Sequence, residues 1–542
     1  MRASRWLVPA LLVAGLLPSV VADAAQGHRI GVRERANGTR ELFDRTTGRR
    51  FVPRGVQLLV KGLEDGAVVD TLFGTQTYDP EFVDETFADL RARGYNTVRV
   101  FLDLCRDDCI ADPAGGLRPA YLDNVADLVR IAREHGLFVL LASADLPEQG
   151  GYGETLPCCE PFGGYRNSAY LSAGGVKTLA RYWRDVVSGL REARTPMSNV
   201  LGFELVQEWF VQNDVPPLSL HAGTVKTADG RTYDLSNDAA RRRMVERNLA
   251  FLIAKVRSAV RALDATALVT MGFFPPPTQA EIEDGAPFVL YTRKAIERSA
   301  LDLVDLHAYP GLQGDLASMA DRFGVSKRTA MPTLMGEFGA FRFAFPSPLS
   351  GAEALATWQA ESCAFGFDGW SLWLWADTDD EVWTGPEGSG EIADVLAPAT
   401  RPNPCRAGGV LRNLALGATA TASASLPGEG PSRAIDGGVV TAWNAGAGAP
   451  ASIEIDLGGL FDVVRIELAV AQDPPGATAH HVYGRSDPSQ PWTLLRDFVG
   501  TTAGGDWLVH RPPAPVALRQ VKVETTASPS FVAWSEIRVV GG

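Results

Sequence analysis

Val-Leu-Gly-Phe-Glu-Leu-Val-Gln-Glu-Trp, at residues 200–209, is the stretch that decides the fold. It opens as a short apolar run with valine at both ends, which predicts a β-strand over 200–206. The run then ends on Gln207 and Glu208, two polar side chains that follow the strand directly. Whether they can do chemistry depends on where the other strands of the same sheet end, so the rest of the chain has to be placed around this one.

From about residue 50 to residue 400, short β-branched runs alternate with amphipathic helical stretches, which is typical of βα units and a parallel sheet. Helical periodicity is clear over 80–93, 121–134 and 238–263. A doubly wound open sheet is one solution, but no glycine-rich phosphate loop follows the first strand. We therefore expect a (β/α)₈ TIM barrel. Its eight strands are predicted at 51–59, 97–102, 138–143, 200–206, 267–273, 303–307, 333–336 and 369–375.

Two of the loops that follow predicted strands are long. Residues 144–175 follow the third strand, and residues 209–236 follow the fourth and contain the hairpin signal Asp229-Gly230. In a barrel, loops at this end of the strands surround the active site. We therefore expect both loops to border the site.

The six cysteines allow 15 pairings, and the sequence does not choose among them. Cys105 and Cys109 follow the second strand, and Cys158 and Cys159 lie in the loop after the third, so all four fall on one rim. We expect disulfides that tie these loops together, with a four-cysteine zinc site as the alternative. The remaining two are Cys363 and Cys405.

Past Cys405 the composition shifts toward Ala, Gly, Thr, Ser and Pro. Short alternating runs at 452–457, 463–470 and 520–524 are separated by turn signals, which predicts an antiparallel β-sandwich. The expected division of the chain is a signal peptide at 1–25, a barrel domain at 26–400, a linker at 401–410 and a sandwich at 411–542.

The N-terminus has the composition of an export signal. Arg2 and Arg5 precede an apolar stretch over 6–21 that prolines interrupt, and Ala22-Asp23-Ala24 offers a small-x-small cleavage pattern. The stretch is too short and interrupted for a membrane span, which needs about 20 apolar residues. We expect a cleaved signal peptide and a secreted protein, with an uncleaved anchor as the alternative.

The net charge of −13 argues against a nucleic-acid partner, because binding phosphates demands a basic face. It fits a soluble protein that meets a neutral ligand, although it does not identify that ligand. No other stretch is long and apolar enough to span a bilayer. We expect a monomer.

Two glutamates end predicted strands three βα units apart. Glu208 follows the fourth strand, and Glu337 follows the seventh within Pro-Thr-Leu-Met-Gly-Glu-Phe-Gly at 332–339. Hydrolysis of a glycosidic bond needs an acid that protonates the leaving oxygen and a second carboxylate that stabilises or traps the oxocarbenium-like centre. The ends of parallel barrel strands bring such a pair together at one face.

Over roughly residues 50–380 the chain resembles the clan of retaining TIM-barrel glycosidases, particularly the cellulase-like glycoside hydrolase family 5. Arg54-Gly55-Val56 resembles the first barrel strand of that family. The predicted second, sixth and eighth strands also resemble the corresponding strands of the family. The resemblance implies that Glu208 is the acid/base and Glu337 the nucleophile. It also implies that Arg99 steadies the nucleophile and that His307 and Tyr309 face the sugar. Trp373, or else Trp375, would form the floor of the sugar subsite.

Two positions depart from the family pattern. Gln207 stands where the family has an asparagine that binds the sugar 2-hydroxyl, and its extra methylene moves the amide by about one bond length. The third strand ends at Ser143 without a histidine often found there. These departures bear on sugar preference and on the exact family. By strand alternation, Trp373 and Trp375 are expected on one face and Trp370 on the other, and Glu204 is expected to be structural.

The expected mechanism is a double displacement that needs no cofactor or metal. Glu337, kept ionised by Arg99, attacks the anomeric carbon, while Glu208 has a raised pKa and donates the proton. Retention predicts carboxyl groups about 5–5.5 Å apart.

The C-terminal region resembles the discoidin, or coagulation-factor 5/8 type C, fold, which includes carbohydrate-binding module family 32. The resemblance rests on 413–417, 434–437, 441–443, 453–458 and 534–539. It implies a structural calcium held by Asp436 and Glu536, with oxygen ligands from Ala434 and Thr441. The alternative is a turn aspartate and a strand glutamate with no ion.

Taken together, these features predict a secreted retaining glycoside hydrolase that cleaves β-mannan or β-glucan, with the sandwich binding the polysaccharide. An exo-acting β-glycosidase is the alternative if the loops 144–175 and 209–236 close the site into a pocket. A catalytically silent glycan-binding adhesin and a glycosyl-transferring enzyme remain open as well.

Overall fold

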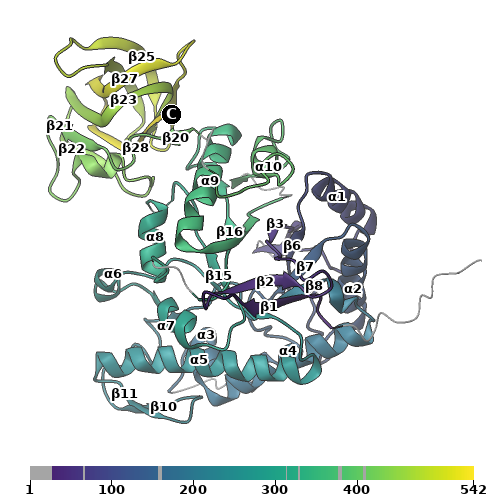
Figure 1. The fold of residues 1–542 in the computed structure, drawn as a ribbon. Helices are drawn as coiled ribbons and strands as arrows, with labels where there is room; N and C mark the ends of the chain where they lie inside the picture. The colour runs from purple at the N-terminus through teal and green to yellow at the C-terminus, as the bar shows by residue number, and fades with distance from the viewer. Residues whose placement is uncertain are drawn as a thin grey trace, which may run out of the picture.

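The computed structural model describes residues 27–64, 67–156, 161–312, 314–326, 330–375, 381–406 and 411–542. The predicted signal peptide, Cys158, Cys159 and residues 407–410 of the predicted linker lie outside the described residues. Two units follow one another along the chain, a parallel barrel and an antiparallel sandwich (Figure 1).

The first unit is the predicted (β/α)₈ barrel. Its parallel strands occur in chain order around the sheet, with the fifth strand split at Met271 into two segments that form the two ends of the hydrogen-bonded order. All eight predicted runs overlap an observed strand, so the prediction of the barrel is confirmed. The strands are β3 (Arg54–Gln57), β6 (Thr97–Phe101), β7 (Phe138–Ala142), β8 (Val200–Glu204), β12 (Val269–Thr270) with β13 (Gly272–Phe273), β15 (Val304–His307), β16 (Thr333–Phe338) and β18 (Phe367–Leu372).

Helices surround the barrel and begin at polar caps. Asp79 accepts hydrogen bonds from two backbone N–H groups of the first turn of its helix, and Asn237 caps the longest helix in the same way. The three helices predicted from periodicity are confirmed as α1 (Pro80–Ala92), α2 (Pro119–Glu134) and α5 (Asp238–Leu263). The others are α3 (Tyr165–Leu171), α4 (Ala173–Glu192), α6 (Gln279–Glu283), α7 (Thr292–Arg298), α8 (Leu316–Phe323), α9 (Pro348–Ser362) and α10 (Glu391–Leu396).

The N-terminal ends of the strands are closed by a hairpin, β1 (Ile30–Glu34) with β2 (Arg40–Asp44). Its Ile30 and Leu42 pack against leucines and a phenylalanine near the starts of the barrel strands, namely Phe138, Leu140, Leu201, Leu268, Leu303 and Leu334. Because this end is sealed by apolar contacts, chemistry is left to the C-terminal ends of the strands.

The C-terminal end carries several short additions. The loop after β8 forms the predicted hairpin, with β10 (Thr224–Lys226) paired to β11 (Thr232–Asp234), and Asp229-Gly230 lies in its turn. Further short pairs are β4 (Lys61–Glu64) with β5 (Ala67–Asp70), β9 (Val211–Gln212) with β14 (Phe288–Val289), and β17 (Ala340–Phe341) with β19 (Val382–Trp383).

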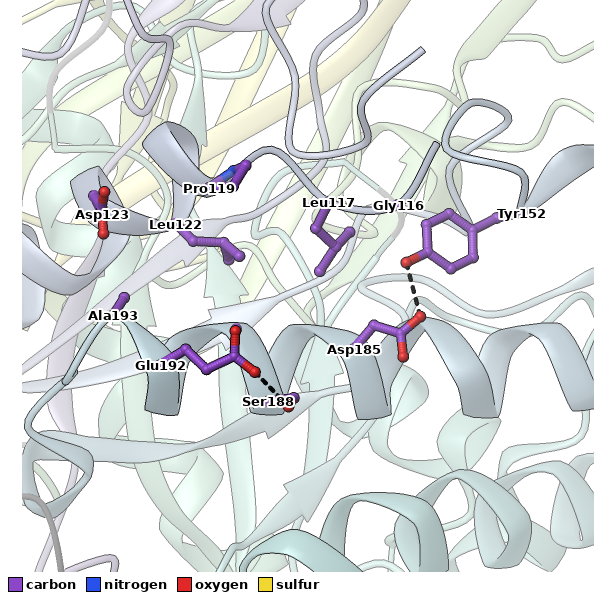
Figure 2. A pocket seen from close by; sticks show the side chains of 11 residues that line it. Gly116, Leu117, Pro119, Leu122, Asp123, Tyr152, Asp185, Ser188, Glu192 and Ala193 are labelled. Carbon is purple, nitrogen blue, oxygen red and sulfur yellow. Dashed lines mark hydrogen bonds between the residues drawn. The ribbon is translucent and has the colours of Figure 1, made fainter. Parts of the chain in front are cut away.

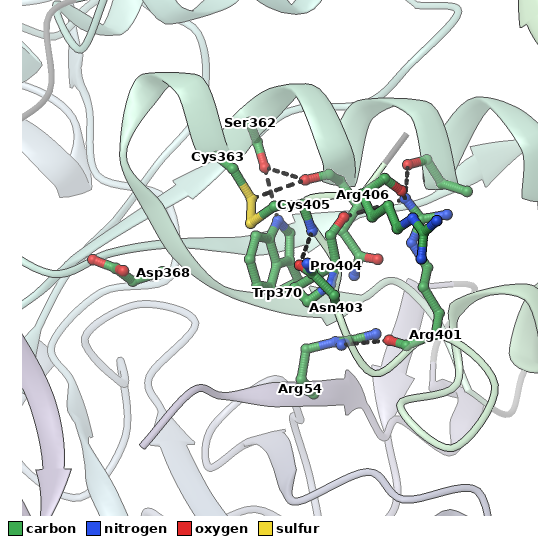
Figure 3. The surroundings of a disulfide bond; sticks show 12 residues. Arg54, Ser362, Cys363, Asp368, Trp370, Arg401, Asn403, Pro404, Cys405 and Arg406 are labelled. Carbon is green, nitrogen blue, oxygen red and sulfur yellow. Dashed lines mark hydrogen bonds between the residues drawn. A yellow bond between two sulfur atoms is a disulfide. The ribbon is translucent and has the colours of Figure 1, made fainter. Parts of the chain in front are cut away.

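The disulfides differ from the expectation. Cys105 pairs with Cys109, four residues along the same loop, so this bond neither ties two loops together nor leaves thiolates for zinc. The second disulfide joins Cys363, after α9, to Cys405, beyond α10 (Figure 3). Near this disulfide, the Arg401 guanidinium donates to the Ala356 carbonyl at 3.0 Å, and the Arg401 backbone carbonyl accepts from the Arg54 guanidinium at 3.1 Å. Residues 401–406 of the predicted linker are therefore fastened to the barrel.

The second unit is an antiparallel β-sandwich built from β20 (Arg412–Asn413) onward. Its central strand β23 alternates buried and less buried residues along its first half, as a half-covered strand should. Trp443 and Trp534 are fully buried in its core. The other strands are β21 (Thr419–Ala422), β22 (Trp443–Gly448), β23 (Ala451–Val470), β24 (Gly476–Arg485), β25 (Thr493–Thr502), β26 (Trp507–His510), β27 (Val516–Ala527) and β28 (Phe531–Gly541).

The sandwich lies beside α8 and α9 of the barrel (Figure 1). Its buried Glu467 accepts from Ser350 Oγ of α9 at 3.0 Å and from Arg465 at 2.5 Å. Arg465 in turn pairs with Glu353 of α9 at 2.5 Å. The junction is therefore an ion-pair network rather than a free linker.

Within the described part of the chain, the helices lack the combination of length and apolarity that crossing a membrane requires.

Candidate active site

Glu337 lies at the C-terminal end of the seventh barrel strand, in β16, with its side chain only 4% exposed. Arg99 of β6 donates to its Oε1 at 2.6 Å, and the Tyr309 hydroxyl donates to its Oε2 at 2.7 Å. These two donors fix the orientation of the carboxylate and stabilise its ionised form.

Glu208 lies just beyond β8, and its side chain is 33% exposed. Arg166 of α3 donates to the Glu208 backbone carbonyl at 3.2 Å and pairs with Asp145 at 3.0 Å. The loop after the third strand thereby holds the segment that carries Glu208. The more open of the two carboxyl groups is thus the one expected to exchange protons with a leaving group and with water.

His307 lies between the two glutamates. Its Nδ1 is 3.0 Å from Glu208 Oε1 and 3.3 Å from Glu337 Oε2. One carboxylate oxygen of Glu208 and one of Glu337 lie within 4.8 Å of each other and of the ring. The structure therefore brings together both glutamates, Arg99, His307 and Tyr309, which the sequence places on four different strands or strand ends.

The two carboxyl groups have different environments. Partial burial in the site raises the pKa of Glu208 to about 7, although a third of its side chain is exposed, and the positive charges of Arg99 and Arg166 act against the rise. Burial also raises the pKa of Glu337, and Arg99 and His307 oppose that rise most. Only Glu337 has direct bonds to a guanidinium and a phenol, which favour its charged form.

Arg99 is itself held by groups beneath the site. Glu204, the last residue of β8, binds it with two hydrogen bonds of 2.7 and 2.9 Å, and Gln57 of β3 accepts from it at 2.7 Å. Glu204 is completely buried, in keeping with the structural role expected for it. Gln57 was missed from the sequence, although it follows the Arg54-Gly55-Val56 motif on the first strand.

Asp305 is a second residue that the sequence analysis missed. It is fully buried in β15, and one of its carboxyl oxygens lies 3.8 Å from Nε2 of His307. A Cβ at Gly336 would lie 1.7 Å from the same oxygen, so a glycine is required opposite the carboxyl group. Asp305 precedes His307 by two positions, so strand alternation could have placed both on one face.

The tryptophans do not follow the predicted alternation, because β18 ends at Leu372. Trp373 is half-buried and packs edge-on against Phe101, whose ring lies beneath the Arg99 guanidinium. Trp375 is 3% exposed and packs against Tyr95 and Arg93 in the outer helical layer, as Trp370 packs against Arg54. The expectation that Trp375 shares a face with Trp373 is therefore wrong.

Gln207 is half-buried beside Glu208, and its backbone N–H donates to Ser143 O at 2.8 Å. A Cβ at Gly272 would lie 1.8 Å from the Gln207 carbonyl oxygen. The fourth and fifth strands thus approach each other closely here and fix the backbone that carries Gln207 and Glu208.

A hollow on the outer side of the barrel, between α2 and α4, is separate from this site (Figure 2). Four of its polar side chains are bonded in pairs: Tyr152 donates to Asp185 at 3.1 Å, and Ser188 donates to Glu192 at 3.2 Å. Another hollow lies at the loops after β6 and β7, bordered by Asp103, Asp145 and Tyr165. Asp103 accepts from Ser143 and Tyr182, and burial raises its pKa to about 7.

In the sandwich, Asp436 lies close enough to Glu536 for its charge to act on that carboxyl group. Glu536 is fully buried, and burial and the charge of Asp436 raise its pKa well above the ordinary value. Its nearest hydrogen-bond donors, Asn413 and Gly437, are both 3.3 Å away, and the Arg538 guanidinium is 3.9 Å away. Thr441 donates to Asp436 at 2.7 Å. Two carboxylates with weak donors around the buried one fit a hard cation such as calcium.

Comparison with known protein families identifies the second unit. Residues 419–537 match the sequence model of the F5/8 type C domain. This match confirms the predicted resemblance of the C-terminal region, and it lies inside the unit that forms the antiparallel sandwich. No curated protein sequence matches the chain significantly.

Solved structures are similar to each unit. An endo-1,4-β-mannanase from Rhizomucor miehei is 14% identical, with 69% of this chain and 100% of that chain covered and a TM-score of 0.47. The β-mannanase of the blue mussel Mytilus edulis is 13% identical, with 70% and 98% covered and a TM-score of 0.40. Chitosan-binding module 1 of a chitosanase/glucanase from Paenibacillus sp. IK-5 is 28% identical, with 24% and 99% covered and a TM-score of 0.21. The chain consists of a (β/α)₈ barrel followed by an antiparallel sandwich in which residues 419–537 match the F5/8 type C domain.

Proposed function

We propose that this protein is a secreted, retaining glycoside hydrolase that cleaves a β-linked polysaccharide, β-mannan or β-glucan. One observation carries the proposal: Glu208 and Glu337 end different barrel strands, yet an oxygen of each lies within 4.8 Å of the other. That separation supports a nucleophile and an acid working directly on one bond, because an inverting pair stands about 6.5–9.5 Å apart to admit a water molecule.

In the first step, the Glu337 carboxylate attacks the anomeric carbon while the bond from that carbon to the leaving oxygen breaks. Glu208 gives its proton to the leaving oxygen, and a glycosyl ester forms on Glu337. In the second step, Glu208 takes a proton from water, the water oxygen attacks the anomeric carbon, and the ester bond breaks. Both glutamates return to their starting states.

The surroundings of the two carboxyl groups support these roles. Arg99 and Tyr309 bind Glu337, as a nucleophile that must be ionised requires. The raised pKa of Glu208 supports an acid that still holds its proton near neutral pH. His307 can donate from Nδ1 to either carboxylate, so it can bind whichever of the two is ionised at each step.

The sandwich is proposed to bind the same polysaccharide and to hold a structural calcium at Asp436 and Glu536. An F5/8 type C match and the buried Glu536 beside Asp436 support these assignments. Export is proposed from the N-terminal sequence. The disulfide between Cys363 and Cys405 would be stable in an oxidising compartment.

A panel of β-mannans and β-glucans incubated with the wild type, Glu337→Gln and Glu208→Gln tests the function. Of these three proteins, only the wild type is expected to release reducing sugars, and proton NMR should show the β-anomer of the product first. Glu283→Gln, an exposed glutamate on α6, is the matched control and should retain full activity. If the proteins bind a glycan but none of them, the wild type included, hydrolyses it, the chain would be a silent glycan-binding protein and not a hydrolase.

A further inference from the structure

The sandwich contacts two barrel segments that lie next to the candidate site, one that follows Tyr309 and one that follows Glu337. Gly311, two residues after Tyr309, forms a bridge with Gly438 of the sandwich, and Val439 N–H donates to the Gly311 carbonyl at 3.1 Å. In the segment that follows Glu337, Phe343 O accepts from Trp507 Nε1 at 3.0 Å. The junction between the two domains therefore lies next to the site rather than on a remote face of the barrel.

Aromatic rings lead from the site to this junction. The Tyr309 ring, whose hydroxyl is bonded to Glu337, lies 4.9 Å from the Phe341 ring. The Phe341 ring lies 5.3 Å from that of Phe343, with an interplanar angle of 29°. The bond from Trp507 then joins an aromatic residue of the sandwich to Phe343. We call Tyr309, Phe341, Phe343 and Trp507 the aromatic strip.

The outer part of the aromatic strip is open to solvent. Phe343 is 50% exposed although it is a large apolar residue, and Trp507 is partly exposed. The Arg538 guanidinium holds the Trp507 ring in place, since it lies 4.8 Å from the centre of that ring and 4.5 Å from the centre of the Phe345 ring. An exposed ring held in place next to a reacting site is typical of a binding surface.

Pyranose rings fit such a surface. Their C–H faces are apolar and stack on aromatic rings, while their hydroxyl groups stay in water. The Phe341 ring contacts both the Tyr309 ring and the Phe343 ring, so a glycan that contacts Glu337 and Phe343 has to pass Phe341 as well. We therefore expect a chain of several sugars to contact both ends of the strip and a disaccharide at the carboxylates to leave Phe343 uncovered.

Resting on the proposed function, we infer that Phe343 and Trp507 form a glycan-binding platform across the domain junction, which takes the part of a β-linked polysaccharide beyond the sugars at the reacting bond. The barrel and the sandwich then bind one continuous stretch of the same glycan chain. Continuity with the two glutamates favours this occupant over a second protein.

Calorimetric binding to Glu337→Gln, which retains the shape of the site, tests the platform without turnover. The ligands are the disaccharides and hexasaccharides of β-1,4-mannan and β-1,4-glucan. We expect Phe343→Ala and Trp507→Ala, each added to that protein, to weaken hexasaccharide binding about tenfold, as loss of one stacking contact implies. Disaccharide binding should not change.

Three further variants separate stacking from misfolding. Phe343→Trp and Trp507→Phe retain a ring and should retain most of the hexasaccharide affinity, the latter without the bond to Phe343 O. Phe531→Ala removes a ring of the sandwich that is 36% exposed on β28, and it should bind both lengths as its parent does.

The outcomes separate the platform from the hydrolase. Equal loss of affinity for both lengths, no loss, or no hexasaccharide binding to Glu337→Gln would overturn the platform, even if the wild type hydrolyses glycans. A dimer of the wild type that Phe343→Ala dissociates would also overturn it in favour of a self-association surface. Length-selective loss together with an inactive wild type would leave the platform standing and remove the hydrolase.

Discussion

At the scale of single residues, the pKa of Glu208 makes a direct prediction about pH. A general acid must hold its proton before the reaction, and burial raises the pKa of Glu208 to about 7. Activity of the wild type should therefore fall as the pH rises through about 7. The measurement is kcat/KM between pH 4 and pH 9, at constant ionic strength, on a hydrolysed β-linked oligosaccharide.

Glu208→Gln supplies the control for this assignment. With an aryl glycoside whose leaving group needs no proton, the variant should retain glycosylation, and its rate should no longer fall on the alkaline side. An alkaline fall that persists in Glu208→Gln would assign the titrating group to a residue other than Glu208.

Asp305 leads to a prediction about stability. Burial and the charge of Glu204 raise its pKa well above the ordinary value, against the opposing charge of Arg99. A carboxyl group with a raised folded-state pKa binds its proton more strongly in the folded state, so its contribution to stability is lost as the pH rises. Asp305→Asn has no carboxyl group at this position and so does not lose this contribution. The difference in melting temperature, Asp305→Asn minus the wild type, should therefore increase from pH 4.5 to pH 8.

The same substitution separates the structural and catalytic consequences of Asp305. Asparagine retains the size and a donor toward His307 Nε2, so Asp305→Asn should retain activity, whereas Asp305→Leu should lower kcat by misplacing the ring. A relative melting temperature of Asp305→Asn that falls with rising pH would mean that Asp305 is ionised and paired in the folded protein.

At the scale of elements, the turn that carries Asp436 is expected to bind calcium. Ca²⁺ bound only to the folded state stabilises it by about 2.7 kcal/mol at a concentration 100 times Kd. Added Ca²⁺ should therefore raise the melting temperature of the protein after chelator treatment, and Asp436→Asn should remove the increase.

Asp456 provides the matched control for the calcium turn. Its Oδ1 accepts from Gly458 N–H at 2.9 Å, as Asp436 Oδ1 accepts from Gly438 N–H at 3.0 Å. Asp456→Asn should keep the response to Ca²⁺. Wild-type protein that melts at one temperature with and without Ca²⁺ would favour the alternative without an ion.

The two disulfides should contribute unequally. The bond between Cys363 and Cys405 spans 42 residues, and that between Cys105 and Cys109 spans four. Loop-closure entropy predicts about 3–4 kcal/mol for the longer loop and clearly less for the shorter one. Replacing each pair with serine and comparing unfolding in denaturant gives the ranking. An equal or reversed ranking would contradict it.

The sequence predicts elements better than it predicts contacts between them. Strands and helices follow from local periodicity, and the ends of parallel strands meet whatever their loops do, so the sequence could predict that Glu208 and Glu337 lie close together. Arg99, His307 and Tyr309 were predicted from the resemblance to TIM-barrel glycosidases and not from periodicity. Trp375 was misplaced because alternation holds only while the strand continues, and β18 ends at Leu372. The pairing of Cys105 with Cys109 depends on the local path of a loop, which no periodicity encodes.

At the scale of the whole molecule, Glu467 is the buried charge at the junction between barrel and sandwich. It is fully buried and binds Ser350 of the barrel together with Arg465, and the Arg538 guanidinium lies 3.7 Å away. Removing one partner of a buried ion network costs about 3–5 kcal/mol, because the remaining charges stay buried. The wild type should therefore unfold in a single calorimetric transition.

Glu467→Ala should separate that transition into two, one for each domain, because the barrel and the sandwich each have their own apolar core. Asp456→Ala, which removes a partly exposed pair with Arg519 within the sandwich, should leave one transition. Loosening the junction also moves Trp507 away from Phe343, so Glu467→Ala should lower hexasaccharide affinity in the same direction as Trp507→Ala. Two transitions with unchanged hexasaccharide affinity would show that docking and glycan binding are independent, and the aromatic strip would then end within the barrel.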